Sequence, residues 1–175
     1  SSWNQMGSDI DGEASEDRSG MSVALSSDGY IVAIGASFNQ GNGLMSGHVR
    51  LYQWDGISWN QLGSDIDGEY EFDFSGESIA LSSNGSVAAI GAIFNGSLSG
   101  HVRLYQWDGS SWNQLGNDIN GEDADDMAGY SVALSSDGSV VAIGAVNNDG
   151  NGTDSGHVRL YQWDGVFWNK LGNDI

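Results

Sequence analysis

The sequence predicts an all-β fold of tandem four-stranded antiparallel blades of the β-propeller type. Three observations carry this prediction. The stretch SGHVRLYQWDG occurs three times without change, at 46–56, 99–109 and 155–165. Asp-Gly and Asn-Gly turn signals cut each repeat into pieces of strand length. The strand candidates are apolar on both faces, which is typical of a sheet that is covered on both sides.

The repeats divide the chain into units. The motif WNQLGSDIDGE and its variants begin at four tryptophans, the last copy being cut short: Trp3, Trp59, Trp112 and Trp168. We therefore predict a lone fourth strand with an acidic connector followed by three blade repeats, over 1–18, 19–74, 75–127 and 128–175. Four-stranded units that cover one another are typical of propeller blades, although three are fewer than the usual four to eight.

Each unit is expected to contain four strands. In the first unit they are predicted over 22–26, 30–36, 48–54 and 58–63. Asp28-Gly29 is expected to join the first two as a tight hairpin, because both central residues of such a turn take positive φ. The segment before the third strand is three residues shorter in the second unit, which marks it as a loop.

The turn between the third and fourth strands leaves two registers open. A two-residue loop at Asp55-Gly56 places Tyr52 opposite Trp59, whereas a four-residue loop places Trp54 opposite Trp59. Either aromatic pair adds up to about 1 kcal/mol to the sheet.

The repeat resembles a known family. The pattern SGMSVALSSDGYIVAIGA followed by SGHVRLYQ is similar to the FG-GAP repeat, the blade unit of integrin α-type β-propellers. The resemblance covers nearly the whole chain and implies a propeller of such blades. The proline that follows Gly-Ala in the family is missing, and SSDG or SSNG replaces its Asp-rich Ca²⁺ loop. The usual metal site of the family is therefore not carried over.

Composition excludes several classes of function. Twenty-four acids against five bases give a net charge of −19, which argues against binding to nucleic acid and to anionic membranes. No stretch approaches the roughly 20 apolar residues of a membrane-spanning helix, so we expect no membrane insertion. The chain has no cysteine. It also lacks GxSxG and any Ser-His-Asp pattern, and we expect no catalytic residues and no enzyme.

Calcium is the one cofactor that the sequence suggests. Sixteen of the 24 acids lie in three connectors, over Asp9–Asp17, over Asp65–Asp73 with Glu77, and over Asp118–Asp126. Oxygen ligands at alternate positions beside a glycine suit Ca²⁺, although the spacing is not that of an EF-hand and solvated turns are the simpler interpretation. The candidate ligands are Asp9, Asp11, Glu13, Asp65, Asp67, Glu69, Asp118, Asn120 and Glu122. Asn147–Asp154 is a weaker candidate.

One arginine and one histidine stand at the same position of every repeat. Arg50, Arg103 and Arg159 are expected to form structural ion pairs with connector carboxylates, with Asp9, Asp65 and Asp118 as candidates, because guanidinium binds carboxylate through two parallel hydrogen bonds. His48, His101 and His157 have no ligand partner at a fixed spacing in the sequence. We interpret them as hydrogen bonders at a sheet edge.

Two further features bear on the setting of the protein. The tryptophans are expected to fill the core between blades, with stacking on sugars as the alternative. Three Asn-x-Ser/Thr sequons, at Asn95, Asn151 and Asn84, predict N-glycosylation and an extracellular or cell-surface location.

The function predicted from these features is a non-enzymatic, extracellular structural or adhesive repeat protein, a segment of a filament or a longer array. Its expected partners are copies of itself or further repeats of the same chain, and glycans are a further possibility. The alternative is a ligand-binding propeller of integrin or lectin type, with or without Ca²⁺. The uniformity of the third strand favours the structural role, because a binding site needs one unit to differ from the others.

Overall fold

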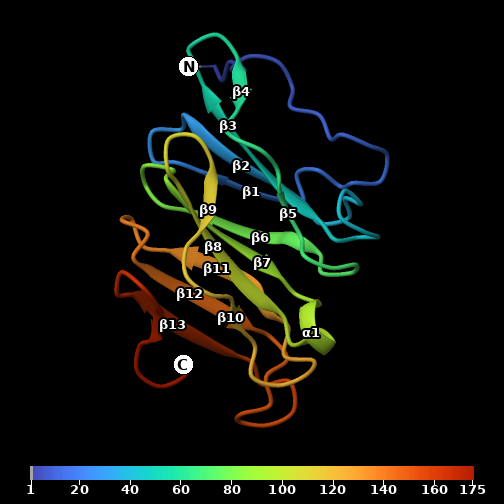
Figure 1. The fold of residues 1–175 in the computed structure, drawn as a ribbon, viewed down its shortest axis with the longest axis vertical. Coiled ribbons are helices and arrows are strands. Elements are labelled where there is room, and N and C mark those ends of the chain that lie inside the picture. Colours follow the sequence, from blue (N-terminus) through green and yellow to red (C-terminus); the bar gives the residue numbers. More distant parts are fainter. Residues whose placement is uncertain (1) are drawn as a thin grey trace.

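The computed structural model describes residues 2–175 and contains three antiparallel sheets, one per repeat. The sheets follow one another through the molecule, with the chain running from the first to the third (Figure 1). The all-β fold of four-stranded blades is thereby confirmed. The strands are β1 (Ser22–Leu25), β2 (Ile31–Ala36), β3 (His48–Trp54), β4 (Trp59–Gln61) and β5 (Ile66–Asp67); β6 (Ser75–Leu81), β7 (Val87–Ala92), β8 (His101–Trp107), β9 (Trp112–Gln114) and β10 (Ile119–Asn120); and β11 (Ala128–Leu134), β12 (Val140–Ala145), β13 (His157–Trp163) and β14 (Trp168–Lys170).

The outer strand of a blade is interrupted. In the first blade β4 and β5 both pair with β3, so the outer strand is made of two short pieces, of which only β4 lies within the predicted 58–63. Leu62 still donates its backbone N–H to Leu51, and regular pairing returns when Ile66 aligns with Val49. The break between the two pieces turns Asp65 toward His48.

The first hairpin differs from the expected turn type. The backbone N–H of Gly29 bonds to the carbonyl of Ser26, and among the turn residues only Gly29 has a positive φ, of 75°. The side chain of Asp28 accepts hydrogen bonds from the Ser26 hydroxyl and from the Tyr30 amide. Asp28 therefore closes the turn through its carboxylate rather than through a left-handed backbone, which gives a longer loop than a two-residue hairpin.

The second hairpin selects the four-residue loop. Trp54 lies opposite Trp59, and their rings are 5.3 Å apart at an angle of 53°. The same pairing recurs between Trp107 and Trp112. Asp55 holds the loop by accepting hydrogen bonds from the amides of residues 57 and 58 at 2.8 Å.

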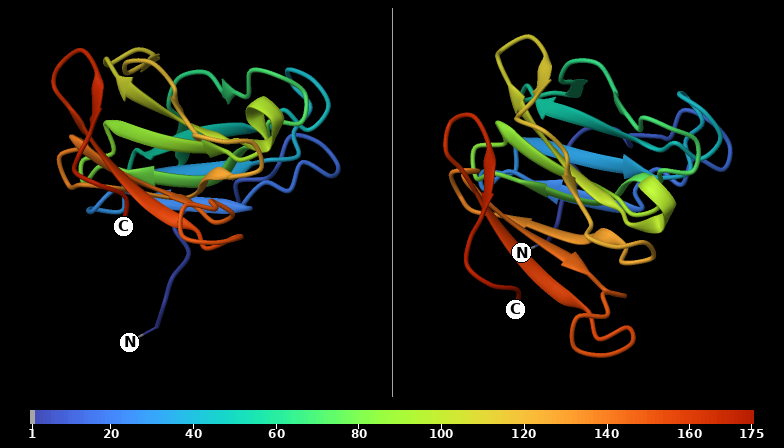
Figure 2. Two further views of the ribbon diagram at one scale, coloured as in Figure 1. Left: turned by 90° about the horizontal axis from the view of Figure 1, so that it is seen from below. Right: turned by 60° about the horizontal axis from the view of Figure 1, so that its bottom comes forward.

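The hydrophobic core lies between blades rather than within one blade. One cluster joins the first and second blades and includes Val49, Leu51 and Ile90, and a second cluster joins the second and third blades and includes Leu104 and Val141. The middle sheet is therefore covered on both faces, as its two apolar faces predict, and the first and third sheets are each covered on one. Figure 2 shows the sheets side by side in two further views.

Glycine permits the blades to approach closely. A Cβ at Gly91, in β7, would overlap the carbonyl oxygen of Gly129 in the next blade, to which the Ser78 hydroxyl donates a hydrogen bond of 2.6 Å. The equivalent Gly144, in β12, would meet only atoms of Ser131 in its own blade. The glycine of the Ile-Gly-Ala motif is thus a requirement of the junction.

Residues 2–21 contain no strand. They still lie against the first blade as an outer strand and connector would, because the Met6 carbonyl accepts a hydrogen bond of 2.9 Å from the Trp59 indole. In the later blades Trp112 and Trp168 donate to Leu62 and to Leu115 in the same way. Residues 2–21 have no third strand beside them with which to pair.

The short loop of the second blade forms one turn, α1 (Asn95–Leu98), in which Gly96 and Ser97 have φ near 60°. Across residues 2–175, no helix has the length and apolar character needed to cross a bilayer.

We expect Gly91→Ala to destabilise the protein by about 1–3 kcal/mol, because the added methyl group must push two backbones apart. Gly144→Ala is the matched control, and it should cost clearly less because no following blade lies above it. Urea unfolding of the two variants measures the difference, and equal losses would contradict the close-approach argument.

We also expect the turn aspartate Asp55 to titrate at an unusually low pH. Hydrogen bonds from the amides of Ser58 and Ile57 and from the Asn60 side chain lower its pKa from 3.8 to about 2. Its contribution to folding is present above pH 3.8 and is lost as the pH falls through about 2. A carboxyl ¹³C NMR titration checks this, and a midpoint near 3.8 would contradict it. Asp55→Asn should remove this part of the acid dependence of unfolding.

Candidate functional site

A cluster of one glutamate, one histidine and one aspartate recurs three times. The three groups are Glu13–His48–Asp65, Glu69–His101–Asp118 and Glu122–His157–Asp174, and in each the potential ligand atoms lie within 4.8 Å of one another. The histidine comes from the start of the third strand and the aspartate from the break in the outer strand of the same blade. The glutamate comes from the connector that precedes the blade. Each cluster therefore joins a blade to the connector before it.

His48 and His101 are buried and His157 is partly buried, and the nearest acids of His48 and His157 are too far away for hydrogen bonds. Nδ1 of His48 lies 3.8 Å from Oε2 of Glu13 and 3.8 Å from Oδ2 of Asp65. His101 is 1% exposed, and neither of its ring nitrogens has a hydrogen-bond partner. Burial and the Arg103 guanidinium lower the pKa of His101, while Asp118 and Asp73 act in the opposite direction. The histidines thus face acids from both sides, which sequence spacing alone did not reveal.

The column of arginines forms ion pairs, but with other partners than Asp9, Asp65 and Asp118. Arg50 donates to the backbone carbonyl of Asp11 at 2.7 Å and lies 3.7 Å from Glu13. Arg103 repeats this with the Asp67 carbonyl at 2.7 Å and Glu69 at 3.6 Å.

Arg159 differs, because it pairs with both oxygens of Asp174 and also with Glu122. All three guanidinium groups are buried and reach back to the preceding connector. The partners differ from the expected ones because the connector folds so that its first carboxylate faces the histidine instead.

The residues predicted to bind calcium do not gather into one site per connector. Asp65 lies with His48 in the first blade, whereas Glu69, four residues later, lies with His101 in the second. Asp9 accepts a hydrogen bond from Gln5. Among the remaining candidates, the side chains of Asp11, Asp67 and Asn120 are exposed and belong to none of the three clusters.

A buried aspartate in each connector escaped the sequence analysis. Asp73 is 2% exposed and accepts hydrogen bonds from the amides of Glu69 and Tyr70 and from the side chain of Asn95. Asp17 pairs with Asn39 and Asp126 with Asn148 in the same way. The signal that could have found these pairs is the register of the repeat, in which an asparagine follows each Ile-Gly-Ala motif at a fixed distance.

The sequons occupy three different environments. The Asn95 amide is bonded to Asp73, the Asn84 side chain accepts hydrogen bonds from the Ser82 and Ser86 hydroxyls within its turn, and Asn151 is exposed. The six paired tryptophans are half-buried, and Trp3 is fully exposed. One tryptophan of each pair donates its indole N–H to the preceding segment: Trp59, Trp112 and Trp168.

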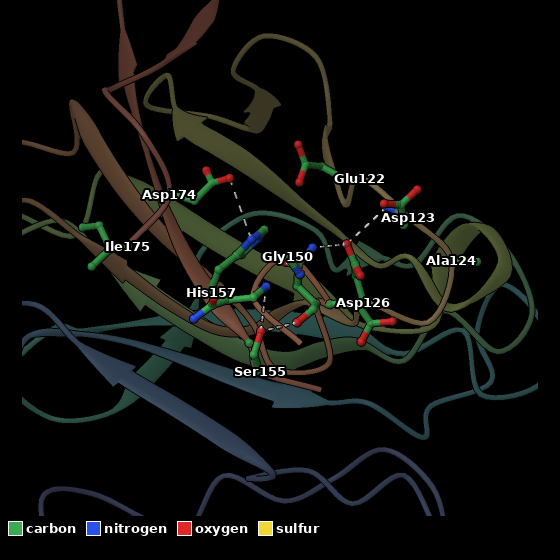
Figure 3. Close-up of a pocket in the computed structure, with 13 residues that line it drawn as sticks. Glu122, Asp123, Ala124, Asp126, Gly150, Ser155, His157, Asp174 and Ile175 are labelled. Atoms are coloured by element: carbon green, nitrogen blue, oxygen red, sulfur yellow. Dashed lines mark hydrogen bonds and ion pairs between the residues drawn. The ribbon is translucent and has the colours of Figure 1, made fainter. Parts of the chain in front are cut away.

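A hollow of about 730 Å³ lies on the third blade. Figure 3 shows Asp174, His157 and Ile175 on one side of it and Glu122, Asp123 and Asp126 on the other. Asn151, Ser155 and Gly156 complete its wall.

The first blade shows what lies in the corresponding place there. Asn42 donates to the carbonyl of Gly68, Ser46 accepts from the Ser75 amide, and Gly47 accepts from the Gly68 amide. The hollow on the third blade is therefore the place that the next connector fills on the first.

Comparisons with known proteins support the fold. No family model matches the chain, and no curated protein matches its sequence, so the resemblance to FG-GAP repeats stays a prediction. A structure from Bacteroides uniformis, described as a 6-phosphogluconolactonase, is similar with a TM-score of 0.59 and 13% identity over 87% of this chain and 39% of its own. The periplasmic gluconolactonase PpgL of Pseudomonas aeruginosa gives 0.56 and 14% identity, over 81% and 39%.

TolB from Acinetobacter baumannii gives a TM-score of 0.47 and 15% identity, covering 89% of this chain and 32% of its own. The chain thus spans less than half the length of these three structures. The two lactonase likenesses, together with the sheets described above, establish a propeller-type fold.

We expect Arg103→Met to lower the free energy of unfolding by roughly 2–3 kcal/mol, because it leaves the Asp67 carbonyl and Glu69 without their buried partner. Arg18→Met is the control, since Arg18 is exposed and stacks on the Phe38 ring at 3.7 Å, a contact worth about 1 kcal/mol or less. Chemical denaturation compares the two variants. Equal losses would show that the arginine column does not hold the junction.

Proposed function

We propose that this chain is a non-enzymatic structural segment of an array of propeller blades. Its two end faces are interfaces for further blades of the same repeat. The observation that carries the proposal is a mismatch in exposure. Apolar residues that are covered at the two internal junctions are exposed at the two ends of the array, although the sequence at those positions is nearly the same.

The first blade presents one such face. Val23 and Leu25 of β1 are 64% and 61% exposed. Their counterparts in the second blade, Ile79 and Leu81, pack against the core between the first and second blades. Val23 and Leu25 therefore keep the chemistry of a junction without the neighbour that would cover it.

The third blade presents the opposite face. Val158 and Ile175 are 38% and 80% exposed, whereas Val49 and Ile66 at the same positions in the first blade are 0% and 5% exposed. The hollow beside them has the polar groups that elsewhere receive a connector. Because the two internal junctions already join these two kinds of face, the exposed faces are complementary to each other.

An extracellular or cell-surface setting with an adhesive role is part of the proposal and is supported only by the sequons and the high negative charge. The alternative function is a propeller that binds a ligand in the hollow of the third blade. The structural role is favoured because Asn42, Ser46 and Gly47, the counterparts in the first blade of Asn151, Ser155 and Gly156 in the hollow, bind the following connector.

The association of the chain in solution tests the proposal. Residues 3–10 repeat the outer-strand motif of 168–175, so in a head-to-tail contact the two segments compete for one place. We therefore expect weak, concentration-dependent association of the full chain and stronger association when residues 1–10 are removed. In the shorter chain, Leu171 of a neighbouring copy could accept the Trp59 indole bond that Met6 now accepts.

Sedimentation analysis measures this association, with Leu25→Glu as the interface variant. Because Leu25 is exposed in the single chain, Leu25→Glu should abolish association while changing stability by only about 0.5 kcal/mol. Ile57→Glu, in an exposed turn outside both faces, is the control and should change neither property. A monomer at all concentrations, with and without residues 1–10, would overturn self-assembly and favour the ligand-binding alternative.

A further inference from the structure

The Glu–His–Asp clusters of the first two blades have the geometry of an unfilled coordination site. In the first, the histidine nitrogen is 3.8 Å from each carboxylate oxygen, beyond the 2.7–3.2 Å of a hydrogen bond. Two ligand atoms bound to one Zn²⁺ at about 2.1 Å lie roughly 3.4 Å apart in a tetrahedral arrangement. A small movement of the side chains would therefore allow the histidine nitrogen and the carboxylate oxygens to bind one ion between them.

The unused ligand atoms are held in place by their neighbours. In the first cluster Glu13 presents Oε1 to Arg50 and Oε2 to His48. Asp65 accepts a hydrogen bond of 2.5 Å from Gln61 on Oδ1 and turns Oδ2 to His48. Each carboxylate therefore turns one oxygen to an outer partner and the other to the histidine, which is how outer residues orient metal ligands.

The second cluster repeats this arrangement and adds a buried group without a partner. Glu69 faces Arg103 through Oε1, and Asp118 accepts from Gln114 at 2.6 Å on Oδ1. Both ring nitrogens of the fully buried His101 lack hydrogen bonds. Such a group costs free energy unless something binds it, and a ligand atom of His101 lies within 4.8 Å of both carboxylates.

The third cluster is different. Arg159 bonds to both oxygens of Asp174, and Lys170 also pairs with Asp174. Glu122 pairs with Arg159 through Oε2. Its carboxylates are therefore already neutralised by cations, and no free oxygen pair faces His157.

We propose that Glu13–His48–Asp65 and Glu69–His101–Asp118 are binding sites for a divalent transition-metal ion of the Zn²⁺ type. One imidazole nitrogen and two carboxylate oxygens are ligands that Zn²⁺ accepts, whereas Ca²⁺ prefers six to eight oxygens. The ion would tie a blade to the connector before it, beside the arginine that crosses the same junction. The site thus differs from an oxygen-only calcium site within one connector.

Isothermal titration calorimetry of the metal-free chain with Zn²⁺ tests this proposal. We expect about two ions per chain, one for each cluster whose carboxylates are free. We expect Glu69→Gln to weaken one of the two sites by about tenfold or more, and His101→Asn to do the same. Glu69 is 35% exposed, so its variant should fold even if the histidine variant does not.

Two matched controls lie in the same connector. Glu71→Gln removes an exposed acid. Asp67→Asn introduces the residue that stands at the equivalent position, Asn120, in the next repeat. Both variants should still bind two ions. In addition, the NMR signals of the His101 ring should shift on addition of Zn²⁺ and not on addition of Ca²⁺ at the same concentration. If the chain takes up no Zn²⁺, the proposal is overturned. A water molecule between the histidine and the two carboxylates would then be the bridging atom. Equal weakening by Glu71→Gln would overturn it too, because binding would then be diffuse attraction to acids.

Discussion

The structure depends on one constraint: a sheet with two apolar faces is stable only when another sheet covers each face. The inner strands meet this demand by bringing backbones into direct contact, with Gly35 against Gly76 and Gly91 against Gly129. The core residues then interdigitate across the junction instead of within a blade. Both hydrophobic clusters therefore belong to pairs of blades, as in other repeat proteins.

The polar groups follow the same rule. Each arginine of the third strand, each indole of the fourth and each buried aspartate of a connector makes bonds that join one repeat to the next or fix the segment between them. Because Arg103 donates to a backbone carbonyl, the contact does not depend on which side chain the connector carries. This explains how the eleven-residue stretch can stay unchanged while the connectors vary in sequence.

The distribution of charge also has a structural reason. The connectors carry most of the acids, and they are drawn to the junctions where the arginines and histidines lie. The second and third connectors are each divided between two blades, with the first carboxylate beside one histidine and the glutamate beside the next. The proposed metal sites and the proposed array use the same feature, since both place a bond between one repeat and its neighbour.

Much of the fold could be predicted from the sequence alone. The identical stretches gave the number of blades, the turn signals gave the strands, and the apolar residues on both faces predicted coverage by neighbours. The pairing of Arg50, Arg103 and Arg159 with connector groups also followed, because a recurring cation among so many acids has few other partners.

Only the tertiary structure decided which groups meet. The outer strand breaks between β4 and β5, and this break turns Asp65 toward His48, which no residue spacing indicated. The four-residue turn placed Trp54 opposite Trp59, and in this loop Asp55 accepts hydrogen bonds from two amides at once. The glutamate of each cluster comes from the connector that precedes the blade, so the cluster exists only where that connector packs against the blade. Local sequence specifies the blade, and packing between blades creates the sites.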